Sequence, residues 1–209
     1  MAKRRVEGAN DRELVERTLA ELRRGEVAAA YGELVRRYQD RLYNFLLNYT
    51  GDPAEAEDVA QEAFVKALAK LSQFEQRSTF FTWLCRIAIN ELNNRRRKSR
   101  PVSGVLGGRE EQRGPGVVEP MAEESPEDVV SAGEIRERVR RAIQQLPEEF
   151  RLAVTLVDLG QMSYREAAEV MNVPEGTVKS RLARGRRILQ ELLADLLETK
   201  PAGAKSSSS

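Results

Sequence analysis

Side chains that could bind nucleic acid are concentrated in one stretch near the C-terminus, from Ser163 to Leu189. Within it, small polar and basic residues share one side of a helix at about 100° per residue: Thr177, Ser180, Arg184 and Arg187. Further basic residues flank this side: Lys179, Arg181 and Arg186. Arginine hydrogen-bonds guanine edges and phosphates, and short serine and threonine side chains let a helix lie deep in the major groove. The pattern therefore predicts a DNA-binding helix.

A helix-turn-helix would position these side chains. Ahead of them, apolar residues at helical spacing predict a first helix with one buried stripe: Tyr164, Ala167, Ala168 and Met171. Pro174 disfavours the helical conformation in the residue before it, and it is well placed as the first residue of a new helix. That second helix has its own apolar side: Val178, Leu182, Gly185 and Leu189. The alternative is an ordinary helical hairpin with a solvated basic face.

Composition excludes several kinds of catalytic and metal site. Cys85 is the single cysteine and histidine is absent, so we predict no zinc site, no Ser-His or Cys-His catalysis and no cofactor. A single cysteine cannot form an internal disulfide, which fits a reducing compartment. No apolar run approaches the ~20 residues of a membrane span, and the basic N-terminus lacks the apolar core of a signal peptide. We therefore expect a cytoplasmic protein without stable membrane insertion that is not an enzyme.

Apolar residues recur at three- and four-residue spacing through most of the chain, which predicts an all-α fold. Helices are expected from Val27 to Tyr49, from Pro53 to Leu71 and from Glu148 to Leu159. A further helix is expected to begin after Ser78 or Thr79, and a C-terminal module to begin at Gly133 or Glu134.

The outward side of the helix from Pro53 to Leu71 carries acidic and amide groups around one apolar residue: Asp58, Gln61, Glu62 and Val65. An apolar side chain in such surroundings is typical of a partner surface. The alternative is a solvated face with one stray valine, since single exposed apolar residues are common.

Charge is unevenly distributed although the net charge is only +1. A basic block lies at the end of the helix that follows Thr79: Arg95, Arg96, Arg97, Lys98 and Arg100. These cations exceed what the helix dipole requires, which favours phosphate contact. Residues 99–132 combine glycine, proline and acidic residues without an apolar period, which predicts a flexible acidic linker. The expected division is an N-terminal domain at 1–98, the linker at 99–132, a C-terminal domain at 133–197 and a disordered tail at 198–209.

Taken together, the motifs resemble those of extracytoplasmic-function RNA polymerase sigma factors of the sigma-E, envelope-stress type. Four segments carry the resemblance: Asp58 to Ala67, Phe80 to Asn90, Leu146 to Arg151 and Ser163 to Leu182. The resemblance covers the chain from Arg12 to Leu197 and implies two helical domains, a region 2 bundle and a region 4 helix-turn-helix. Phe80, Phe81 and Trp83 could be aromatic residues that assist melting, but their helical spacing favours core packing for most of them.

The resemblance also implies roles for particular residues. The outward face of the third helix would dock on the clamp helices of the large polymerase subunit through Asp58, Gln61, Glu62, Val65 and Lys66. The loop from Leu71 to Ser78 would capture a base flipped from the melted non-template strand of the minus-ten element. The residues assigned to this element are Phe74, Ser78, Asn90, Arg95, Arg96, Arg97 and Lys98. Those assigned to the minus-thirty-five element are Thr177, Lys179, Ser180, Arg181, Arg184 and Arg187.

The expected function is promoter-specific transcription initiation in a complex with RNA polymerase core, through its clamp helices and flap. The expected DNA is double-stranded promoter together with the melted non-template strand. An anti-sigma factor is a further expected partner, from the resemblance alone. Two alternatives stay open: an autonomous helix-turn-helix regulator that binds operator DNA, and a regulatory interaction protein that no longer reads promoters.

Overall fold

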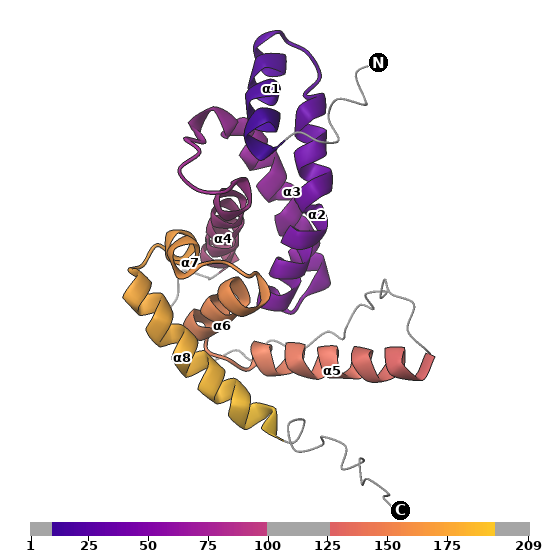
Figure 1. The fold of residues 1–209 in the computed structure, drawn as a ribbon, viewed down its shortest axis with the longest axis vertical. Coiled ribbons are helices and arrows are strands. Elements are labelled where there is room, and N and C mark those ends of the chain that lie inside the picture. Colours follow the sequence, from indigo (N-terminus) through magenta and orange to yellow (C-terminus); the bar gives the residue numbers. More distant parts are fainter. Residues whose placement is uncertain (1–9, 100–125, 195–209) are drawn as a thin grey trace, which may run out of the picture.

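The computed structural model describes residues 10–99 and 126–194, with side chains described for 10–98 and 133–194. This part of the chain is helical and contains no strand, which confirms the predicted all-α fold. The first four helices form an N-terminal module (Figure 1): α1 (Asp11–Arg23), α2 (Ala29–Thr50), α3 (Pro53–Ala69) and α4 (Phe80–Ser99). The last four form a C-terminal module: α5 (Pro126–Gln144), α6 (Glu148–Val154), α7 (Tyr164–Met171) and α8 (Glu175–Leu192).

Local sequence signals set the boundaries of the first helices. The Asn10 side chain accepts a hydrogen bond from the Glu13 backbone at 2.9 Å and closes a capping box at the start of α1. Gly51 ends α2 in the left-handed conformation, with φ of 77°. Asp52 caps α3 and Pro53 is its first residue, as predicted. The predicted end of α3 at Leu71 was late, because Leu71 opens a separate 3-10 turn at Leu71–Gln73.

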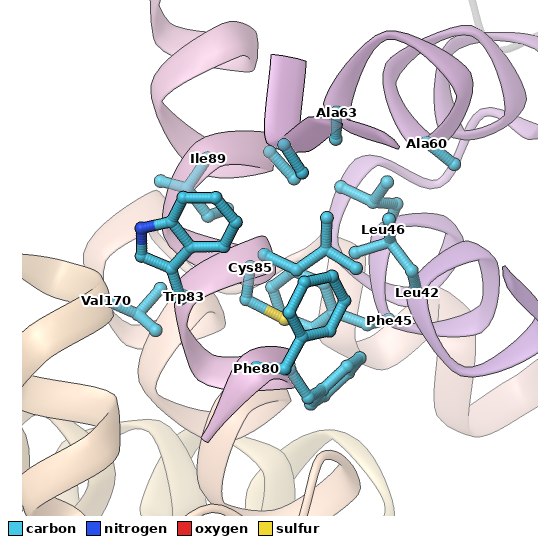
Figure 2. Close-up of a cluster of buried hydrophobic side chains, with 14 of the residues drawn as sticks. Leu42, Phe45, Leu46, Ala60, Ala63, Phe80, Trp83, Cys85, Ile89 and Val170 are labelled. Carbon is cyan, nitrogen blue, oxygen red and sulfur yellow. The ribbon is translucent and has the colours of Figure 1, made fainter. Parts of the chain in front are cut away.

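The core of the N-terminal module lies between α2, α3 and α4 (Figure 2). Its aromatic residues in α4 are almost fully buried, with Phe80 1%, Phe81 3% and Trp83 6% exposed. Their predicted packing role is therefore confirmed. Cys85 is fully buried among them, and this burial raises the pKa of its thiol. A buried thiol of this kind is a packing residue rather than a nucleophile.

The C-terminal module differs from expectation at two places. The predicted start of α5 at Gly133 or Glu134 was wrong, because the helix begins at Pro126. Proline suits a first helical position, and the acidic residues after it favour a helix N-terminus; linker and helix start have similar composition here. The helix expected from Glu148 to Leu159 changes geometry after Val154, since Thr155–Leu159 is a π-helical segment.

The helix-turn-helix is formed by α7 and α8 and confirms the predicted pattern. Ser163 and Glu166 close a capping box that begins α7, and Asn172 ends it with φ of 52°. Pro174 is the cap before α8 rather than its first residue, one position from the prediction. The predicted apolar side of α8 faces inward: Val178, Leu182 and Gly185 are buried and Leu189 is partly buried.

Gly185 allows α8 to approach α6 closely. A Cβ atom there would lie 2.8 Å from Val154 Cγ2 and 3.4 Å from Phe150 Cβ. Gly185→Ala is expected to lower the free energy of unfolding by about 1 kcal/mol, because overpacking of about 1–3 kcal/mol exceeds the helix propensity gained, ~1 kcal/mol. Urea unfolding monitored by circular dichroism measures this change in the free energy of unfolding.

Gly176 provides the matched control, because a Cβ there would meet nothing within 4 Å. Gly176→Ala is expected to raise the free energy of unfolding by up to ~1 kcal/mol through helix propensity alone. If both substitutions stabilised the protein, the close approach at Gly185 would not be a packing constraint.

Candidate nucleic-acid interface

The outward side of α8 presents the predicted DNA-contacting residues to solvent. Lys179, Ser180, Arg184 and Arg187 are exposed, and Thr177 is partly exposed. The Ser180 hydroxyl donates to the Thr177 carbonyl at 2.9 Å, which keeps this side chain close to the helix surface. A helix surface with short polar side chains and projecting arginines fits the shape of a major groove.

The cations of α8 are not equivalent. Arg181 pairs with Glu149 at 2.8 Å, and Arg186 makes a two-point contact with Asp158 at 3.1 and 2.5 Å. Within the described residues, no carboxylate pairs with Arg184 or Arg187. Among the described residues these two guanidinium groups, like the Lys179 ammonium beside the Tyr164 ring, can bind DNA without first breaking an ion pair.

The predicted partner surface on α3 is also exposed. Asp58 and Gln61 are exposed, Glu62 and Lys66 are partly exposed, and Val65 is 65% exposed. A groove between α2 and α3 lies next to it, with apolar lining from Val35, Tyr43, Ala60 and Phe64 and polar lining from Gln39, Asp40, Glu57 and Gln61. The surface thus combines an apolar floor with acidic and amide groups, a composition suited to a protein partner.

Glu91 links this surface to the basic end of α4. Its carboxylate pairs with Lys66 and, at 3.2 Å, with Arg95. Lys66 also lies 3.3 Å from Glu62, and Arg95 lies 3.8 Å from Asp58. The hydrogen bond from Lys66 holds the pKa of Glu91 below its ordinary value, and the bond from Arg95 acts in the same direction. Sequence reasoning missed Glu91, because a single glutamate in a helix carries no signal of its partners.

The predicted minus-ten residues fall into two environments. Phe74 is partly buried, with its ring 5.0 Å from that of Trp83 and 5.9 Å from that of Phe80. Ser78 is partly exposed and Asn90 is exposed, so both amide and hydroxyl groups can be reached from solvent. In the same loop Gln76 adopts φ of 56°, a conformation that non-glycine residues seldom adopt outside functional or tightly constrained sites.

The basic block at the end of α4 is divided by the fold. Arg95 pairs with Glu91, Arg96 pairs with Glu148 of the C-terminal module at 2.5 Å, and Arg97 donates to Asn94 Oδ1 at 2.7 Å. Lys98 is exposed. Charges that look uniform in the sequence therefore have different partners, and Arg96 in particular contacts the other module.

No group of acidic, histidine or cysteine side chains in the described part of the chain is arranged to hold a metal ion. None of the described helices is long and apolar enough to cross a membrane.

Comparison with known proteins places the chain in a family. Models of sigma-70 region 2 and sigma-70 region 4 match residues 34–101 and 136–189. The chain is 39% identical over 189 residues to the RNA polymerase sigma-H factor of Pseudomonas aeruginosa, covering 90% of this chain and 95% of that protein. It is 35% identical over 197 residues to the sigma-E factor of Escherichia coli, covering 91% of this chain and 98% of that protein. It is 32% identical over 188 residues to the sigma factor SigW of Bacillus subtilis, covering 88% of this chain and 98% of that protein.

Solved structures share the fold. The sigma factor RpoE of Bartonella quintana, in complex with the anti-sigma factor NepR, matches with a TM-score of 0.59 at 24% identity, over 82% of this chain and 98% of that one. CnrH in complex with the cytosolic domain of CnrY matches with a TM-score of 0.61 at 23% identity, over 91% and 99%.

The chain belongs to the extracytoplasmic-function sigma factors of the sigma-70 family. It is a regulatory protein that directs RNA polymerase to promoters for transcription initiation. The predicted family and function are thereby confirmed, whereas the roles of individual residues remain predictions.

Proposed function

We propose that each module reads one promoter element while the chain is bound to polymerase core. Asp58, Gln61, Glu62, Val65 and Lys66 form the surface that docks on the clamp helices. Phe74, Ser78, Asn90 and the basic residues Arg95 to Lys98 contact the minus-ten element. Thr177, Lys179, Ser180, Arg181, Arg184 and Arg187 contact the minus-thirty-five element. The proposed domain bounds are 1–98 and 133–197, with a tail at 198–209; the joining segment 99–132 includes the first residues of α5, which begins at Pro126.

The observation that carries this proposal is the exposed side of α8. Short polar side chains lie flat on it, and Arg184 and Arg187 project without a carboxylate partner among the described residues. Direct readout of base edges needs such unpaired guanidinium donors. The solvent-exposed Val65 supports the docking surface, because an apolar residue amid polar ones is typical of a protein contact.

The chemistry of RNA synthesis belongs to the polymerase core, so the chain acts as a specificity subunit in the cytoplasm and is not itself an enzyme. The region 4 module would also contact the flap of the large subunit. An anti-sigma factor is proposed as a regulator, supported by the fold shared with two sigma factors in such complexes.

Arg184→Ala is expected to lower run-off transcription with purified core by about 10- to 100-fold, because a bidentate arginine–base contact discriminates by about 1–3 kcal/mol. Affinity for core, measured by pull-down or anisotropy, should stay unchanged. Arg136→Ala is the matched control, since Arg136 is an exposed arginine on α5, outside the helix-turn-helix.

The outcomes separate the alternatives. Loss of core binding by Arg184→Ala with unchanged promoter choice would show that the roles are wrongly assigned. Specific duplex binding by the free chain, without any transcription on adding core, would instead favour an autonomous helix-turn-helix regulator. Core binding without run-off product would favour a regulatory interaction protein.

A further inference from the structure

The groove between α2 and α3 is an apolar depression that carries two exposed carboxylates. Its volume is about 360 Å³, which is in the size range of sites that bind a ligand or a few side chains. Val35 and Tyr43 of α2 and Phe64 of α3 contribute to the apolar lining, and Asp40 and Glu57 are the exposed acidic residues. An occupant of complementary chemistry would combine an apolar side chain with cations.

The two carboxylates are not neutralised by other described residues. Glu57 accepts a hydrogen bond from the Gln61 amide at 3.2 Å, and no cation in the described part of the chain pairs with Glu57 or Asp40. Two arginines of α2 close to Asp40 in sequence pair elsewhere: Arg36 with Glu33 and Arg37 with Asp11, each at 2.7 Å. The groove therefore keeps a negative charge, which attracts a cationic segment within a Debye length of ~8–10 Å.

The chain immediately before α1 has the complementary chemistry. Residues 1–9 read M-A-K-R-R-V-E-G-A, in which three consecutive cations precede one valine: Lys3, Arg4, Arg5 and Val6. These four residues are called the basic segment below. They supply positive charge and one apolar side chain within four positions, as the groove requires.

The start of α1 lies beside the groove. Asp11 accepts hydrogen bonds from Arg37 at 2.7 Å and from the Tyr38 hydroxyl. These two residues of α2 directly precede Gln39 and Asp40, which line the groove. The first turn of α1 is thus fixed to the part of α2 that borders the groove.

Residues 1–9 are long enough to reach across α2. Nine residues span up to ~30 Å at 3.3–3.6 Å per residue, whereas a helix with its side chains is about 10–12 Å across. A tether this short also holds the basic segment near the groove at an effective concentration in the millimolar range. Even a weak contact is well populated at that concentration.

We propose that the basic segment binds the groove between α2 and α3 in the free chain, with Val6 on the apolar lining and the cations beside Asp40 and Glu57. Gln61 lines this groove and also belongs to the surface assigned to core docking. The basic segment and polymerase core therefore compete for this part of α3. That consequence rests on the proposed function, whereas the contact between the segment and the groove does not.

A nitroxide spin label on Ala2→Cys tests the contact, because it broadens the nuclear magnetic resonance signals of nearby amides. Cys85 is fully buried and does not compete for the label. The amides of Glu57, Ala60 and Gln61 are expected to lose about half of their intensity or more, since a tethered segment is mostly bound. The triple variant Lys3→Glu, Arg4→Glu and Arg5→Glu should recover most of this intensity.

A charge exchange separates a specific contact from random encounters of the segment. Asp40→Arg with Glu57→Arg should also abolish the broadening, and combining this pair with the triple variant should restore it. Glu134→Arg with Glu191→Arg is the matched control, because these glutamates are exposed, lie on α5 and α8 and give the same change in net charge. This control should show the broadening of wild type.

Two results would overturn the contact. One is an absence of broadening at these α3 amides in wild type, or broadening that survives both sets of charge changes. The other is broadening that arises only between chains, when spin-labelled chain is mixed with unlabelled, isotope-enriched chain. That result would assign the groove to a second copy.

Affinity for purified core tests the competition. The triple variant is expected to bind core about three- to tenfold more tightly than wild type, because its groove no longer loses population to the segment-bound state. Equal affinity, with the broadening lost, would overturn the competition. If neither chain binds core while the broadening results hold, the proposed function fails and the contact stands.

Discussion

Changing Asp58 and Glu62 together to alanine is expected to weaken binding to polymerase core by about 10- to 100-fold, as when residues central to an interface are truncated. Both carboxylates belong to the α3 surface around the exposed Val65. Each also lies near a cation of the Glu91 network, Asp58 at 3.8 Å from Arg95 and Glu62 at 3.3 Å from Lys66. Their loss removes charge from the docking surface while the core of the module stays intact.

The measurement is a titration of labelled chain with purified core, followed by anisotropy. Glu16→Ala with Glu191→Ala is the control, because these glutamates are exposed, lie on α1 and α8 and give the same change in net charge. Unchanged affinity in the Asp58/Glu62 variant, with its helicity intact, would contradict the docking surface.

Phe80→Ala is expected to have the largest effect on stability, about 3–5 kcal/mol of the free energy of unfolding. The Phe80 side chain is 1% exposed, and its ring lies 5.7 Å from that of Tyr38 and 5.9 Å from those of Phe74 and Trp83. Truncation would leave a cavity among rings that cannot easily collapse into it. A loss of this size is a large part of the 5–15 kcal/mol typical of a whole domain.

Urea unfolding measures this effect, and Phe80→Leu is the matched comparison because it retains most of the apolar volume. The Phe80→Leu variant should lose clearly less free energy of unfolding than the Phe80→Ala variant. If Phe80→Ala left stability unchanged and lowered only promoter melting, Phe80 would contact DNA instead of supporting the core.

Much of the fold could be predicted from local sequence, because local groups determine helix boundaries. The Asp52 side chain and the capping box at Ser163 each satisfy backbone donors within three residues. Pro53 removes one unsatisfied donor, because it has no backbone N–H at the first helical position. The exposed side of α8 was likewise predictable from helical periodicity alone. The start of α5 could not be predicted in this way, because a proline followed by acidic residues fits both a linker and a first helical turn.

Contacts between the modules could not be predicted from one helix at a time. Val170 lies off the apolar stripe expected for α7, and its burial comes from α4 of the other module. Glu91 carries no sequence signal of its partners and Arg96 was predicted to contact DNA, yet Glu91 joins Lys66 to Arg95 and Arg96 pairs with Glu148. Such partners come from distant parts of the chain, and periodicity carries no information about them.

On polymerase core, the two modules are proposed to read one promoter together. In vitro transcription of fragmented bacterial DNA with purified core and this chain, followed by mapping of RNA starts, tests it directly. The predicted result is a set of chain-dependent starts that share two sequence elements at a constant spacing. Chain-dependent starts that share one element, or no chain-dependent starts at all, would contradict it.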